Sequence, residues 1–169
     1  MSALRDAIDH TMLGWIKPEL DEVLRQARIE LEAFAEDPVD SSRMRLCAGY
    51  LHQAQGTLHM VELYAPEMVA EEMARLAEAL RDGVIADRDA ACSALLRGML
   101  LLPDYLERLQ GGHRDIPIVL LPLLNELRAA RGEGGLSESI LFAPDLARVV
   151  PDTLPAAEIS SDPEAALRQ

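Results

Sequence analysis

Aromatic residues are scarce in this chain of 169 residues, at 4% of the sequence. Alanine, leucine and glutamate are abundant instead, a mixture that favours helix and leaves little of the aromatic and β-branched material that strands use. Hydrophobic residues make up 49% and charged residues 27% of the chain, which is typical of one globular domain rather than a disordered chain. The composition therefore predicts an all-α fold without a sheet.

Basic residues are also in short supply. Sixteen Lys and Arg stand against 29 Asp and Glu, so the net charge is −13. A chain this acidic repels phosphate backbones and anionic lipid, which argues against general nucleic-acid or membrane-surface binding. No apolar run approaches the roughly 20 residues that span a bilayer, and the first residues do not resemble a secretory signal. We expect a cytoplasmic chain without membrane insertion.

Cysteine is rare, and the usual catalytic motifs are missing. Cys47 and Cys92 form neither a CxxC pair nor a metal-spaced set, so we expect reduced, buried thiols. No nucleophile elbow, phosphate loop or zinc helix occurs. The consecutive acids Glu71 and Glu72 point in different directions, and we expect them on a solvated face. We therefore expect no metal and no cofactor.

Apolar residues at helical spacing predict five helices, at about residues 18–36, 42–63, 65–82, 87–110 and 117–131. A shorter amphipathic segment is expected at 2–15. Pro103 is expected to kink its helix or to remove a backbone hydrogen bond, and Pro122 is expected to kink the following helix. Segment 118–124 is apolar almost all round, so we expect it to be buried. Together these elements predict an antiparallel helical bundle with a four-helix core and an additional C-terminal helix.

The composition changes at Gly132. From there to Gln169 acids outnumber arginines, and four of the ten prolines occur. We therefore interpret residues 1–131 as the bundle and 132–169 as an extended acidic linker or tail that adds little to its stability. An apolar patch at 141–146 interrupts the tail. It is either residual hydrophobicity in a linker or a segment docked on the helices or on a partner.

His52 stands out in the second predicted helix. At about 100° per residue, it lies on the other side of the helix from the apolar stripe of Cys47, Ala54, Leu58 and Val61. We therefore expect His52 to be exposed to solvent. Gly56 costs roughly 1 kcal/mol in a helix interior compared with alanine, and it leaves room for a bulky group to approach the imidazole. Six neighbours are candidates for contacting that group: Arg45, Ala48, Gly49, Gln55, Gly56 and His59.

The run from His52 through Gln55 to Gly56 resembles the His-x-x-Lys-Gly motif of histidine phosphotransfer (HPt) domains. These domains are helical bundles whose histidine relays a phosphoryl group to or from the aspartate of a receiver domain. The resemblance implies that His52 is the phosphoacceptor and that Gly56 leaves space for the receiver. Gln55 replaces the lysine, and a neutral amide cannot supply the positive charge that strengthens contacts to a phosphoryl group. An exposed histidine without chemistry remains the alternative.

Two longer stretches of sequence make the family resemblance more specific. Residues 55–63 and 120–132 resemble the N-terminal region of the type IV pilus chemosensory histidine kinases (the ChpA/PilL family), and the same block is similar to pilus scaffold proteins of the FimL type. The likeness extends over about 14–132 and the patch at 141–146. It implies the N-terminal, HPt-like piece of a large histidine kinase. It also implies receiver-domain response regulators and a polar landmark protein as partners, and a place at the cell pole. FimL relatives lack a histidine at the position of His52.

Three interpretations follow. The first is a non-catalytic, HPt-like docking or scaffold module of a chemotaxis-like two-component system that controls type IV pili and twitching motility. The second is an active phosphotransfer domain in which His52 relays phosphoryl groups. The third is a dimerisation bundle without a specific receiver contact. Because of Gln55, we expect the fragment to be a poor phosphoacceptor.

Overall fold

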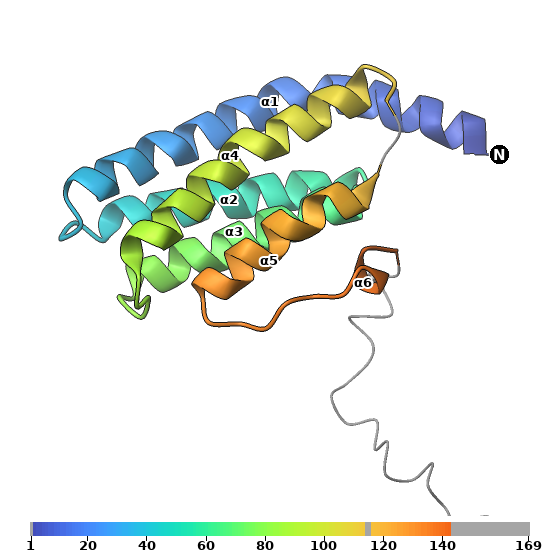
Figure 1. Ribbon diagram of the computed structural model, residues 1–169. Coiled ribbons are helices and arrows are strands. Elements are labelled where there is room, and N and C mark those ends of the chain that lie inside the picture. Colours follow the sequence, from blue (N-terminus) through green and yellow to red (C-terminus); the bar gives the residue numbers. More distant parts are fainter. Residues whose placement is uncertain (1, 114–115, 143–169) are drawn as a thin grey trace, which may run out of the picture.

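The computed structural model describes residues 2–113 and 116–142, and these are helical without a strand (Figure 1). The all-α fold is therefore confirmed. The helices are α1 (Ser2–Glu36), α2 (Ser42–Met60), α3 (Tyr64–Arg81), α4 (Arg88–Gln110), the 3₁₀ helix η1 (Pro117–Leu120), α5 (Leu121–Ala130) and the short α6 (Ser139–Phe142).

The four long helices form the core of the bundle. Helix α2 packs against α1 and α3, and α4 closes the arrangement by packing against both α1 and α3. Helix α5 lies against α3 and α4 (Figure 1). One apolar core connects these helices, and its largest fully buried side chains are Leu20, Leu24, Met44, Leu51, Leu58, Met73, Leu76, Leu95, Leu102, Leu106, Leu124 and Leu127.

Short turns fix the order of the helices. Glu62 has a φ of 59° between α2 and α3, and Gly83 has a φ of 72° after α3. Such left-handed backbone reverses the chain within a few residues, and glycine adopts it at low cost. Asp87 starts α4, because its carboxylate accepts a hydrogen bond from the Ala90 N–H at 3.1 Å.

Helix α1 is longer than the sequence predicts. It continues through Pro18 in one piece, whereas we expect a separate segment at 2–15 and a helix that begins at Pro18. Leu13 and Leu20 are both buried in the core on either side of the proline. Burial of one continuous face outweighs the cost of a proline inside a helix, which is about 3 kcal/mol.

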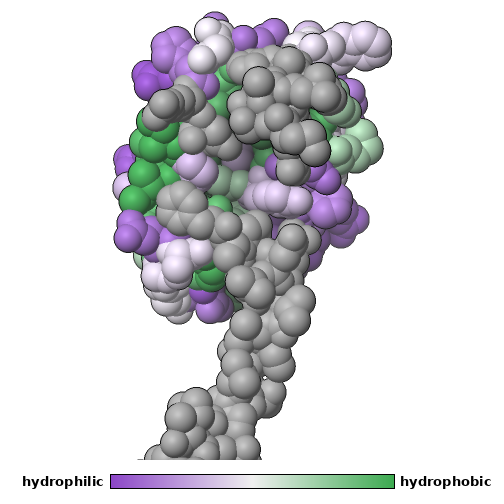
Figure 2. All heavy atoms as spheres, turned by 90° about the vertical axis from the view of Figure 1, so that its right-hand side faces the viewer, coloured by the Kyte–Doolittle hydropathy of each residue, from purple (hydrophilic) through white to green (hydrophobic). Residues whose placement is uncertain are grey.

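The segment after α4 also differs from the expectation. One helix is predicted over 117–131, but η1 precedes α5, and Pro122 lies in the first turn of α5. There its missing N–H costs nothing, so it starts a helix instead of bending one. The expected burial of 118–124 is wrong for Ile118 and Val119, which are 39% and 58% exposed. Figure 2 faces this end of the bundle and shows hydrophobic side chains at its surface.

The chain beyond Gly132 keeps contact with the bundle. Asn125 accepts a hydrogen bond from the Leu136 N–H at 2.7 Å, and Arg128 donates one to the Gly134 carbonyl at 2.7 Å. Leu141 is buried in the core cluster. Residues 143–146, the rest of the apolar patch, lie outside the described residues. The domain boundary at residue 131 stays a prediction.

None of the helices that the structure describes is both long enough and apolar enough to cross a bilayer.

Candidate functional site

His52 is on the surface of α2, with 52% of its side chain exposed. It does not point straight away from the bundle. Its ring turns sideways towards α3, where Nε2 forms a hydrogen bond with Oε1 of Glu78. Buried side chains such as Leu51 and Leu58 lie about 100–120° from His52 around the helix. His52 is therefore on the flank of α2 beside α3, and the outermost line of α2 runs about a quarter turn away.

The contact with Glu78 decides which imidazole nitrogen carries the proton. An ionised carboxylate only accepts hydrogen bonds, so Nε2 of His52 is the donor. Nε2 therefore has no free lone pair while this bond persists. Nδ1 keeps a lone pair in the neutral ring.

His59 repeats the arrangement two turns further along α2. Its Nδ1 lies 3.0 Å from Oε1 of Glu67, and Glu67 is buried at the start of α3. The His59 side chain is 58% exposed. Both histidines therefore bridge α2 to carboxylates of α3 at separate points.

The other predicted site residues are divided between surface and interior. Arg45 is exposed, and Gln55 is half-buried. An added Cβ at Gly49 or Gly56 would meet nothing within 4 Å, so both leave open space above the helix. The expectation that Ala48 contacts an approaching group is wrong, because Ala48 is 3% exposed and belongs to the core. Helix α2 packs against both α1 and α3, and Ala48 belongs to the core cluster that these helices share.

The outermost line of α2 carries residues that the sequence interpretation missed. Leu46 is 48% exposed and Met60 is 70% exposed, and Gln53 lies between them on the same line. These residues are spaced by seven positions, or about two helical turns. The sequence did carry a signal for them, because positions 46, 53 and 60 do not belong to the apolar core stripe of the same helix.

Glu72 is a second residue that was missed. It is 5% exposed, whereas we expect both Glu71 and Glu72 on a solvated face. Arg128 donates to its carboxylate at 3.0 Å and Arg131 at 2.7 Å, which joins α3 to α5. The fifth helix brings these arginines over α3, and the sequence around Glu72 holds no signal of that packing.

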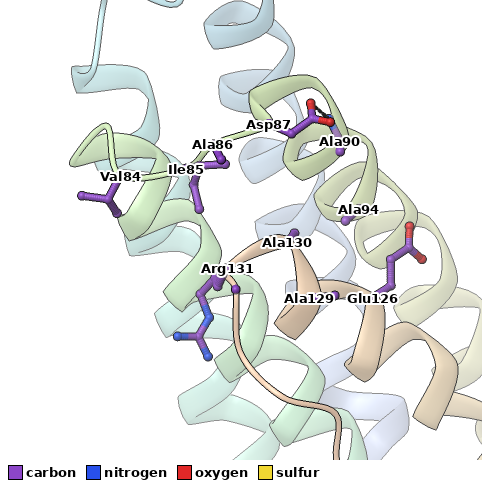
Figure 3. A pocket seen from close by; sticks show the side chains of 11 residues that line it. Val84, Ile85, Ala86, Asp87, Ala90, Ala94, Glu126, Ala129, Ala130 and Arg131 are labelled. Atoms are coloured by element: carbon purple, nitrogen blue, oxygen red, sulfur yellow. Dashed lines mark hydrogen bonds between the residues drawn. The ribbon is translucent and has the colours of Figure 1, made fainter.

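A notch of about 560 Å³ lies among the α3–α4 loop, the start of α4 and the end of α5 (Figure 3). Its walls are largely alanine and loop residues. Each charged group in them has a partner within the protein: Asp87 caps α4, Glu126 accepts from Arg97 at 2.7 Å, and Arg131 binds Glu72. Because no reactive side chains converge in it, the notch does not resemble an active site.

Among the described residues, no three His, Cys, Asp or Glu side chains come together as ligands of a metal ion would. The half-buried Cys92 lies along a groove between α1 and α4, and Cys47 is fully buried. The candidate site is therefore a surface, formed by the exposed side of α2 with His52 on its flank.

Comparison with known proteins shows a similarity to a scaffold protein. The chain is 35% identical over 133 residues to the scaffold protein FimL of Pseudomonas aeruginosa, an alignment that takes in 79% of this chain. It covers 24% of FimL, so the chain spans about a quarter of that protein's length. No family model matches the chain, and no solved structure matches it. Over most of its length this sequence is therefore similar to a segment of a scaffold protein.

Proposed function

We propose that this chain is a non-catalytic, HPt-like docking module of a chemotaxis-like two-component system that controls type IV pili and twitching motility. It is the N-terminal module of a ChpA/PilL-type histidine kinase, and the kinase activity belongs to other parts of that protein. The similarity to a scaffold protein supports a docking role. The bundle with an open face on α2 supplies a surface for it.

The hydrogen bond between His52 and Glu78 carries the non-catalytic part of the proposal. A phosphoryl group on Nε2 would replace the proton that this bond uses and would place its negative charge against the carboxylate. Glu78 would have to rotate away first. The bond therefore opposes phosphorylation at this nitrogen.

Gln55 acts in the same direction. It stands where the resemblance places a lysine, and a neutral amide donor forms weaker bonds to phosphoryl oxygens than an ammonium does. The difference between neutral and charge-assisted hydrogen bonds is on the order of 1 kcal/mol, or several-fold in occupancy. We therefore expect the unmodified module to be a poor phosphoacceptor.

Phosphotransfer tests this directly. The module is incubated with the purified kinase core and labelled ATP, and acid-labile label is measured on the wild type, Gln55→Lys, Glu78→Gln and His52→Gln. We expect faint label on the wild type, several-fold more on Gln55→Lys and on Glu78→Gln, and none on His52→Gln. Strong wild-type label that His52→Gln removes would contradict the proposal and establish phosphotransfer. Label that survives His52→Gln would place the chemistry at another residue.

An active phosphotransfer domain is the second candidate, and the accessibility of the His52 ring favours it. His52 is half exposed, and the open space at Gly56 lets another protein reach the ring. Nδ1 is free of the Glu78 contact. The labelling experiment separates this candidate from the first.

A dimerisation bundle is the third candidate. The exposed Ile116, Ile118 and Val119 at one end of the bundle favour it, because apolar side chains that gather on a surface mark contact sites. Sedimentation of the module from micromolar to millimolar concentration tests it. A monomer throughout would exclude dimerisation.

The partners proposed for the docking module are receiver-domain response regulators of the pilus system and a polar landmark protein. Such partners would hold the module in the cytoplasm at the cell pole. Fluorescent fusions in cells with and without the landmark protein test the location, and diffuse signal in both would contradict it.

A further inference from the structure

Apolar side chains gather at the surface just before α5. Ile116, Ile118 and Val119 are 49%, 39% and 58% exposed, whereas the neighbouring Leu120 is buried. No charged residue occurs from 116 to 125, in a chain whose net charge is −13. Exposed apolar side chains that gather in this way mark a contact site. Ile116, Ile118 and Val119 together form the η1 patch.

The chain after α5 turns back and runs along that helix (Figure 1). Gly132 reverses its direction with a φ of 80°. Arg128 then donates a hydrogen bond to the Gly134 carbonyl at 2.7 Å. Asn125 accepts one from the Leu136 N–H at 2.7 Å and donates one to the Leu136 carbonyl at 3.4 Å. The contacts therefore move towards the start of α5 as the chain proceeds.

The returning chain arrives beside the η1 patch. Helix α6 packs against η1, and Leu141 of α6 is buried in the core cluster. The described chain ends at Phe142, the last residue of this helix. The remaining 27 residues, 143–169, therefore begin next to η1.

The sequence that follows suits an apolar surface. Residues 143–150 lie outside the described residues, but their sequence contains Leu146, Val149 and Val150, three large apolar residues within five positions. No other five positions of 143–169 hold three such residues. Asp145 and Arg148, the charged residues of this stretch, balance each other. A neutral, apolar stretch is not repelled by the acidic bundle.

We propose that residues 146–150 of this chain bind the η1 patch and cover it. The four residues from Phe142 to Leu146 span at most about 14 Å, and they start from a helix that already contacts η1. Leu146, Val149 and Val150 provide the apolar side chains of the contact. Covering the patch removes from water the apolar surface that the start of α5 leaves exposed.

Tethering selects this occupant over a second copy of the chain. A short linker gives its segment an effective concentration on the order of millimolar. A second copy reaches that level only at millimolar protein, and it brings a charge of −13 towards a bundle of the same charge. The segment of the same chain therefore occupies the patch first. A covered patch is not free for the dimer contact that its exposed side chains favour.

The first test traps the contact as a disulfide in the full chain. The background is Cys92→Ser, in which the fully buried Cys47 is the remaining native thiol. Val119→Cys and Leu146→Cys then add one thiol on each side of the contact. Non-reducing electrophoresis and peptide mass spectrometry follow the formation of the disulfide under mild oxidation.

Two further variants separate binding from mere closeness along the chain. Val149→Asp places a charge in the contact, and Thr153→Asp adds the same charge just beyond it as the matched control. We expect a disulfide within one chain that forms at least fivefold more slowly with Val149→Asp and within twofold of the same rate with Thr153→Asp. Equal rates in both variants would overturn the inference. A disulfide between two chains that forms faster at higher protein concentration would replace the segment with a second copy.

Urea unfolding of full chains with their native cysteines tests the contact without a cross-link. We expect Val119→Asp and Val149→Asp each to lower the urea midpoint, and the double variant to lower it no further than the stronger single one, because both break the same contact. Val84→Asp is the control, since Val84 is 72% exposed and lies near the other end of α5. Its effect should add to that of Val149→Asp. An unchanged midpoint in Val149→Asp, or full additivity with Val119→Asp, would overturn the inference.

Discussion

Gly56 and Gly98 both lie inside helices, but their surroundings differ. A Cβ at position 56 would meet no atom within 4 Å. Gly56→Ala therefore gains helix propensity at no steric cost, and we expect the free energy of unfolding to rise by about 0.5–1 kcal/mol in urea denaturation. If a partner uses the open space at Gly56, the Gly56→Ala variant should also bind receiver domains more weakly than the wild type does.

Gly98 provides the opposite case. Its added Cβ would lie 2.8 Å from Sδ of Met73, which is fully buried. Overpacking of this kind costs about 1–3 kcal/mol, which exceeds the gain in helix propensity of about 1 kcal/mol over most of that range. We expect Gly98→Ala to lower the free energy of unfolding in the same assay. A stabilised Gly98→Ala would show that Met73 moves aside freely.

Glu72 binds Arg128 of α5 and Arg131 directly after that helix, while its neighbour Glu71 pairs with Arg75 at the surface. Removing one member of a buried charge cluster leaves the others uncompensated, at a cost of about 3 kcal/mol. We expect Glu72→Gln to lower the free energy of unfolding by that amount in urea denaturation. Glu71→Gln is the control, and it should change stability by less than about 0.5 kcal/mol. Equal effects would mean that the cluster adds nothing beyond a surface ion pair.

At the scale of elements, the segment after α5 tests where the folded unit ends. A chain cut after Gly132 loses the Asn125–Leu136 hydrogen bond and the burial of Leu141, and burying a leucine contributes about 1.5–3 kcal/mol. We expect this fragment to be about 2 kcal/mol less stable than a fragment cut after Phe142. Thermal and urea unfolding of both fragments measure the difference. Equal stability would support a boundary at residue 131.

The elements also mark where sequence reasoning succeeds. Helical spacing of apolar residues predicted α2, α3 and α4 to within a few residues, because each buries one face along its whole length. The errors occurred at proline. Pro18 lies inside a helix and Pro122 starts one, and a local rule does not separate these cases. Packing of the flanking residues on the core decides between them.

At the scale of the whole molecule, the helical angles predicted that His52 is exposed, and its side chain is half exposed. They did not predict its contact with Glu78, since that depends on the register between α2 and α3. The short reversal at Glu62 fixes this register. The burial of Ala48 was not predicted for the same reason, because the angles around a single helix show which side is outward but not how closely a neighbouring helix packs.

The two thiols report on the stability of the whole bundle. Burial raises the pKa of Cys47 to about 12 and also raises the pKa of Cys92. A thiol reacts through its thiolate, so at pH 8 the native Cys47 is both inaccessible and neutral, whereas Cys92 is half-buried beside a groove. We expect a disulfide reagent to modify Cys92 slowly in the native protein and Cys47 only after global unfolding.

The variants Cys92→Ser and Cys47→Ala assign the two phases. In Cys92→Ser only Cys47 can be labelled, and its labelling rate should be proportional to the equilibrium population of unfolded protein. Added urea should therefore accelerate the labelling, because it raises that population. Raising the pH from 7 to 9 should accelerate native-state labelling of Cys92, because more of its thiol ionises, even though its raised pKa keeps it slower than a free cysteine. Native labelling of Cys47 as fast as that of Cys92 would show that α2 detaches from the bundle without global unfolding.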